Sequence, residues 1–134
     1  MGKADLISQT LEILADKHCD PALQIYDWLF GRHPDYQALF VLDTDGGVRG
    51  SMLETCITAL LGIAEGDRTQ RFILDAARSD HQAYGVLPEH FNDMFEAIRD
   101  VTREACAAAW TDDRAAAWMA VLDALEVNAD GPVS

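Results

Sequence analysis

The sequence predicts an all-α protein folded as one domain, and three observations support this prediction. Apolar residues recur at helical spacing along almost the whole chain, and no segment alternates convincingly at period two. Proline and glycine divide the chain into segments of helical length without forming a linker. The 134 residues are enough to bury a core without disulfides. We therefore expect about seven helices of unequal length in a single domain, residues 1–134.

Two helices are expected before residue 33. Their apolar faces are formed by Leu6, Ile7, Leu11 and Leu14 in the first helix, and by Leu23, Tyr26, Leu29 and Phe30 in the second. Asp20-Pro21 is a helix start signal, because an acidic cap precedes a proline at the first helical position. His33-Pro34 starts a short third helix in the same way, and residues 43–47, Asp-Thr-Asp-Gly-Gly, then form a loop.

Four further helices are expected in the rest of the chain. The strongest runs from about Val48 to Glu65 and ends at Gly66, and another leads to His81. Pro88 starts the first of two long helices, and Thr111 caps the second. The apolar faces of these last two helices are formed by Phe91, Met94, Phe95, Ile98 and Val101, and by Trp118, Val121, Leu122 and Leu125.

Charge and composition exclude several classes of partner. Twenty-three acidic and ten basic residues give a formal net charge of −13, which repels phosphate backbones and anionic lipids. No apolar run approaches membrane-spanning length, and the N-terminus lacks the apolar stretch of a signal peptide. We expect a soluble, cytoplasmic protein that binds neither nucleic acid nor membranes. Its three cysteines, which include no CxxC pair, are expected to be reduced, with Cys56 and Cys106 in the core.

Two motifs carry the candidate chemistry. The first runs from Tyr26 to Phe40, Tyr-Asp-Trp-Leu-Phe-Gly-Arg-His-Pro-Asp-Tyr-Gln-Ala-Leu-Phe. The second contains His81, Tyr84-Gly85-Val86 and Pro88-Glu89-His90-Phe91. A histidine that ends one helix, before a glycine turn and a proline that starts the next, is placed to ligate a metal in a helical pocket. In this order and at this separation, the two motifs resemble bacterial haemoglobins of the flavohaemoglobin and single-domain type, and the resemblance covers almost the whole chain.

The resemblance implies a globin fold around a haem pocket and gives several residues a role. His81 is then the proximal ligand of the iron of haem b, Phe40 packs flat against the porphyrin, and Tyr26 is the distal tyrosine whose hydroxyl can donate to bound dioxygen. Counting back from His81 places Arg49 at the distal position, with Leu53 and Ile57 on the following turns. The rest of the pocket wall is expected to include Phe30, Leu74, Ala77, Val86 and Met94, with Trp118 as a further candidate.

Two residues depart from the family pattern. Arg49 stands where glutamine or histidine is common, and its guanidinium is expected to reach a haem propionate or solvent rather than the apolar pocket. Phe91 stands where flavohaemoglobins carry a tyrosine that forms a hydrogen-bond network around the proximal histidine. Without that hydroxyl, the imidazole donates less electron density to iron, which favours reversible ligand binding over peroxidase-like activation.

Each of these residues can also have a purely structural role. His81 can be a satisfied helix-terminal histidine, Phe40 an ordinary core residue, and Tyr26 a buried tyrosine bonded to a backbone carbonyl. The expected function is reversible binding of dioxygen, with nitric oxide or carbon monoxide as further ligands, by a monomer or homodimer. Nitric oxide dioxygenation is open only with a separate reductase, because the sequence has no flavin or nicotinamide signature. A gas or redox sensor and a haemless protein-interaction module are the competing functions.

Overall fold

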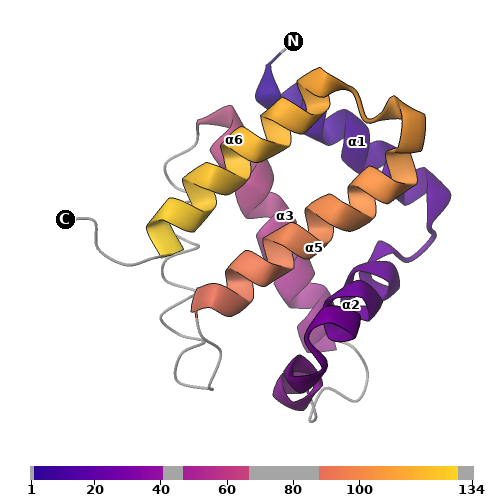
Figure 1. Cartoon of the computed structure of the whole chain (residues 1–134), viewed down its shortest axis with the longest axis vertical. Helices are drawn as coiled ribbons and strands as arrows, with labels where there is room; N and C mark the ends of the chain where they lie inside the picture. Colours follow the sequence, from indigo (N-terminus) through magenta and orange to yellow (C-terminus); the bar gives the residue numbers. More distant parts are fainter. Residues whose placement is uncertain (1, 41–46, 67–87, 130–134) are drawn as a thin grey trace.

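Helices account for every regular element in the described part of the chain, which confirms the all-α prediction (Figure 1). The computed structural model describes residues 2–40, 47–66 and 88–129, with side chains described for residues 2–38, 49–66 and 92–125. In chain order the elements are α1 (Lys3–Lys17), α2 (Pro21–Arg32), η1 (Pro34–Phe40), α3 (Gly47–Glu65), α5 (Pro88–Cys106), η2 (Ala107–Ala109) and α6 (Asp112–Ala129). The loop predicted at 43–47 and the helix predicted before His81 lie mostly or wholly outside the described residues.

The helix boundaries follow the predicted signals closely. Pro21 occupies the first turn of α2, and Pro88 begins α5. The Thr111 cap is confirmed, because its hydroxyl accepts a hydrogen bond from the backbone N–H of Arg114 at 3.4 Å. Gly66 ends α3 with a φ of 81°, a left-handed conformation that glycine adopts without strain. The local sequence therefore sets where these helices begin and end.

The short third helix is a 3-10 helix, a form that helical periodicity did not distinguish from an α-helix. It begins with the backbone N–H of Tyr36 donating to the carbonyl of His33 at 2.9 Å, the i to i+3 bond of this helix type. A second 3-10 helix, η2, follows α5 and was not expected. Ala107 in η2 has a φ of 49°, so the chain changes direction here between α5 and α6.

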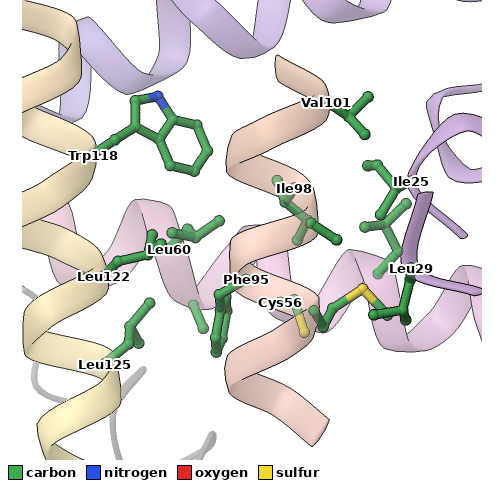
Figure 2. Close-up of a cluster of buried hydrophobic side chains, with 14 of the residues drawn as sticks. Ile25, Leu29, Cys56, Leu60, Phe95, Ile98, Val101, Trp118, Leu122 and Leu125 are labelled. Atoms are coloured by element: carbon green, nitrogen blue, oxygen red, sulfur yellow. The ribbon is translucent and has the colours of Figure 1, made fainter. Parts of the chain in front are cut away.

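The core lies where α5 packs against α1, α2 and α6. The helix α3 completes the core and packs mainly against α1 and α6 (Figure 1). The predicted apolar face of α6 is confirmed, because Trp118, Val121, Leu122 and Leu125 are all almost fully buried. Figure 2 shows Trp118, Leu122 and Leu125 pointing from α6 toward α5, while Ile25 and Leu29 approach α5 from α2. On α5 itself, the apolar face is confirmed for Met94, Phe95, Ile98 and Val101.

The predicted apolar face of α2 is wrong at one position. Leu23 is 59% exposed, whereas Ile25, which was not assigned to this face, is fully buried. The buried side of the helix passes through Ile25 and Tyr26 and, four and three residues after them, Leu29. Leu23 lies to one side of that stripe, one turn before the exposed Asp27. The helix α2 therefore has two overlapping apolar stripes. Packing against α5 buries the stripe that contains Ile25 and leaves Leu23 exposed.

A buried polar network joins α1, α5 and α6 inside this core. The Thr10 hydroxyl donates to the carbonyl of Ile7 at 2.6 Å and accepts a hydrogen bond from Nε1 of Trp118 at 3.0 Å. The Cys106 thiol lies 3.9 Å from the Thr10 carbonyl and donates to it. Cys56 and Cys106 are both buried, as predicted, and burial raises the pKa of the Cys106 thiol although the nearby Arg114 opposes the shift.

Candidate functional site

The structure describes six of the predicted site side chains. They are Tyr26 and Phe30 on α2, Arg49, Leu53 and Ile57 on α3, and Met94 on α5. Phe40 is the last residue of η1 and Phe91 lies in the first turn of α5, but their side chains are outside the described residues. Leu74, Ala77, His81 and Val86 lie outside the described residues altogether.

Five of these six side chains belong to one hydrophobic cluster or pack against it. Tyr26, Leu53 and Met94 are buried members of the same hydrophobic cluster, with exposures of 4%, 7% and 2%. Phe30 and Ile57 are partly buried and pack against that cluster. We call this set, Tyr26, Phe30, Leu53, Ile57 and Met94, the apolar wall. Residues from three helices are thus part of the same core although they lie far apart in the sequence.

Helical spacing explains how α2 and α3 each contribute two members to the apolar wall. Tyr26 and Phe30 are four residues apart, so their rings lie on the same side of α2, with centroids 5.7 Å apart and planes tilted by 41°. Leu53 and Ile57 have the same separation on α3. Each helix thus carries two large side chains one turn apart on the same face.

The polar group in the apolar wall is the hydroxyl of Tyr26. It donates a hydrogen bond to the backbone carbonyl of Arg49, with 2.9 Å between the two oxygens. The sequence allowed two roles for this hydroxyl, a bond to a backbone carbonyl or a bond to a ligand, and the structure shows the first. The bond ties α2 to the first turn of α3. The phenol hydroxyl has a single hydrogen. It can therefore donate to another acceptor only if its bond to the Arg49 carbonyl is broken or shared.

The side chain of Arg49 itself is partly exposed to solvent. Its backbone, rather than its guanidinium, makes the described contact with Tyr26. The sequence places Tyr26 and Arg49 in one predicted site. In the structure they are in contact through the backbone carbonyl of Arg49.

A buried atom without a partner lies near the start of α5. Within the described ranges, Oδ1 of Asn92 is a buried side-chain acceptor that receives no hydrogen bond. Such an atom costs free energy unless a donor from a water or a bound molecule satisfies it. Asn92 was not a predicted site residue. It stands two residues before Met94 in the apolar wall, between Phe91 and Asp93, and no sequence pattern marked it as a site residue.

These observations permit a test of whether the described residues suit a haem group. Ligand pockets for such groups are mostly apolar, with a few placed polar atoms. The apolar wall and the Tyr26 hydroxyl have this character. In the described ranges, no three His, Cys, Asp or Glu side chains gather as a metal site with several protein ligands would require.

A second polar cluster was not predicted. His33, which was predicted only to precede the start of the short third helix, follows α2 and stacks on the ring of Tyr36, with centroids 4.6 Å apart and planes 11° from parallel. The hydroxyl of Tyr36 donates to Oδ2 of Asp93 on α5. Nε2 of His33 lies 3.8 Å from the same oxygen. Tyr36 and Asp93 are 57 residues apart, so no local sequence pattern could have paired them.

A surface groove of about 380 Å³ lies next to this cluster, between α2 and α5. Its lining is charged and includes Arg32, whose guanidinium lies 4.5 Å from the centre of the Trp28 ring. Arg99 and Arg103, also in the lining, both approach Oδ1 of Asp100, at 2.9 and 3.5 Å. This groove differs in character from the apolar wall and does not suit a large apolar cofactor.

The comparisons with known proteins gave one match. A family model described as Globin matches residues 23–128, more than half of the 134-residue chain. The matched range includes both the motif from Tyr26 to Phe40 and the motif that contains His81 and Phe91. No curated protein and no solved structure matches the chain significantly.

Proposed function

Since the chain belongs to the globin family, whose members typically bind haem, we propose that it is a single-domain haem protein that reversibly binds a diatomic gas, dioxygen above all. The observation that carries this proposal is the hydroxyl of the buried Tyr26, in a set of side chains that is otherwise apolar. An apolar wall suits a porphyrin, and a single hydrogen-bond donor suits a small polar ligand beside it.

His81 and Phe40 complete the proposed site from the chain's own residues. We propose His81 as the proximal ligand, with one imidazole nitrogen toward iron and the other donating a hydrogen bond that fixes its tautomer. Phe40, at the end of η1, supplies the aromatic ring for packing on the porphyrin. Leu74, Ala77, Val86 and Phe91 belong to the proposed lining, and Arg49 is proposed to face a propionate or solvent.

Haem, when bound, supplies an iron atom with a coordination position for a gas. The chain's residues decide the environment of that position. The apolar wall excludes water, and the Tyr26 hydroxyl donates a hydrogen bond to the Arg49 carbonyl. Redirecting this hydroxyl toward a gas replaces one acceptor by another, so the gain from the new hydrogen bond is partly offset by the loss of the old one.

The chemistry of haem attachment and turnover is also part of the proposal. The sequence has no CxxC pair of the kind that attaches haem covalently, which favours a b-type haem held by His81 and packing. Phe91 lacks the hydroxyl that would strengthen the imidazole as a ligand, so we propose reversible binding over oxidative turnover. Nitric oxide dioxygenation would need electrons from a separate reductase. The proposed location is the cytoplasm.

Absorption spectra of the recombinant protein test the proposal directly. They are recorded for the oxidised and reduced protein and after addition of carbon monoxide. We expect a Soret band that shifts on reduction and again with carbon monoxide. A protein that shows no Soret band after haem addition would be a haemless interaction module, and the proposal would be wrong.

Substitution of the proposed iron ligand gives a sharper prediction. His81→Ala should abolish or greatly weaken haem incorporation, because it removes the only proposed protein ligand of iron. His18→Ala is the matched control, since His18 is the C-cap of α1 and has no proposed role. Titration with haem, followed at the Soret band, measures both variants. An unchanged spectrum for His81→Ala would remove His81 from the proximal role.

A further inference from the structure

Side chains from two other segments of the chain approach one carboxylate oxygen of Asp93. Oδ2 of Asp93 on α5 accepts the hydrogen bond of the Tyr36 hydroxyl, and Nε2 of His33 lies 3.8 Å away. His33 also stacks on Tyr36, so the end of α2, the 3-10 helix η1 and the start of α5 meet here. We call these residues, His33, Tyr36 and Asp93, the η1 anchor.

The η1 anchor matters because η1 has little stability of its own. A 3-10 helix has poorer hydrogen-bond geometry than an α-helix, and runs of this length are uncommon. Tyr36, by contrast, is 9% exposed and belongs to the hydrophobic core. Its hydrogen bond to a carboxylate is charge-assisted and therefore stronger than a bond between neutral groups.

The position of the η1 anchor relates it to the proposed haem site. Phe40, proposed to pack on the porphyrin, is the last residue of η1 and stands four residues after Tyr36. Asp93 is adjacent to Met94, a member of the apolar wall. The bond between Tyr36 and Asp93 thus joins the segment that bears Phe40 to the helix that bears part of the wall.

We propose that Tyr36 and Asp93 are positioning residues for haem retention: their hydrogen bond fixes η1 against α5 and thereby fixes where Phe40 is presented. The inference rests on the proposed function, because it assigns the anchor a task only if haem is bound. It differs from a general contribution to stability, since it requires that loss of the bond affects η1 and haem more than it affects the rest of the molecule.

The experiment compares the wild type with Tyr36→Phe, Asp93→Asn and the double variant. Tyr36→Phe removes the donor while keeping the ring in the core, and Asp93→Asn keeps an acceptor oxygen but removes its charge. Gln9→Met is the matched control, because it removes a 2.9 Å hydrogen bond from Arg114 that joins α1 to α6. Each variant is measured for its rate of haem loss to an excess of a haem-scavenging protein, and for amide hydrogen exchange with and without haem.

We expect haem loss from Tyr36→Phe to be about tenfold faster than from the wild type, the factor that corresponds to 1.4 kcal/mol. In the haem-free protein, amide hydrogen exchange in η1 should also be faster for Tyr36→Phe than for the wild type. Gln9→Met should change neither the rate of haem loss nor the exchange in η1. Asp93→Asn should show an intermediate rate of haem loss, because an amide oxygen still accepts the bond without the charge. The double variant should lose haem no faster than Tyr36→Phe alone, because the two substitutions break the same bond.

The outcomes separate this inference from the proposed function. If the wild type takes up no haem, the proposed function fails, and the exchange measurement alone still decides whether the bond holds η1. If the wild type binds haem but the anchor variants lose it no faster than Gln9→Met, the positioning role is refuted while the haem proposal stands. Additive effects of the two substitutions would also refute it, because they would show that Tyr36 and Asp93 act separately.

Discussion

At the scale of single residues, Tyr26 is the clearest example of a group whose chemistry depends on its contacts. Its sequence context and its burial agree with a residue of the proposed pocket. Its hydroxyl, however, donates to the Arg49 carbonyl, which is a satisfied arrangement that needs no ligand. Whether the hydroxyl donates to a bound gas therefore depends on competition between the gas and the Arg49 carbonyl as acceptors.

Tyr26→Phe measures this competition. If the hydroxyl turns to the gas, the substitution should speed dioxygen dissociation, because it removes a hydrogen bond to a partly charged ligand worth about 1.5–3 kcal/mol. Loss of the bond to Arg49 should also lower the free energy of unfolding of the haem-free protein by about 0.5–1.5 kcal/mol. Laser photolysis or stopped-flow mixing gives the first quantity, and urea denaturation gives the second.

The dissociation rate and the stability of Tyr26→Phe need not change together. A lower stability with an unaltered dissociation rate would mean that the hydroxyl remains on the Arg49 carbonyl, and Tyr26 would have no direct role in gas binding. A faster dissociation would support the proposed role even if the change in stability were small.

At the scale of helices, the molecule depends on α5 and on the polar contacts that hold other helices to it. The faces of α5 and α6 that the sequence predicted are the faces that meet in the core (Figure 2). Hydrogen bonds then fix how the helices lie against one another. Thr10 links α1 to α6 through Nε1 of Trp118, in a part of the core where both residues are fully buried.

Thr10→Val should destabilise the protein by about 1–3 kcal/mol, because it leaves the buried N–H of Trp118 without an acceptor. Thr102→Val is a closely matched control. Thr102 is also fully buried, but its hydroxyl donates to the carbonyl of Ile98 in its own helix, so valine strands no donor. Chemical denaturation should show a much larger loss for Thr10→Val, and equal losses would mean that the Trp118 bond contributes little.

At the scale of the whole molecule, the surface charge is the dominant property. A formal net charge of −13 on 134 residues creates repulsion among surface carboxylates, which disfavours the compact state. The described acidic residues with nearby cations, such as Asp100 beside Arg99 and Arg103, are balanced locally. The excess of carboxylates elsewhere is screened only by salt.

Stability should consequently rise with ionic strength. Between 0.01 and 0.15 M salt the Debye length falls from about 30 to about 8 Å, which removes most long-range repulsion. We expect the Tm to increase over this range in a series of sodium chloride concentrations. A variant with three exposed acids neutralised, Glu12→Gln, Asp16→Asn and Glu54→Gln, should show a flatter dependence. A Tm that does not change with salt in either protein would contradict this account.

Much of the fold could be predicted because helix periodicity and end signals are local. The starts at Pro21 and Pro88 and the cap at Thr111 were correct for that reason. Leu23 shows where local information stops, since its helix offers two overlapping apolar stripes and only the approach of α5 leaves Leu23 exposed. The roles proposed for His81 and Phe40 remain predictions, because their side chains lie outside the described residues.

The sequence by itself determined the helical class, the family motifs and the residues that could serve a haem. Only the tertiary structure decided which polar groups pair, because pairing depends on how helices are rotated and packed against one another. Tyr26 finds the backbone of Arg49 at a separation of 23 residues, and Tyr36 finds Asp93 at 57. Periodicity places each of these side chains on a helix face, but it contains no information about the partner that the opposing helix brings to it.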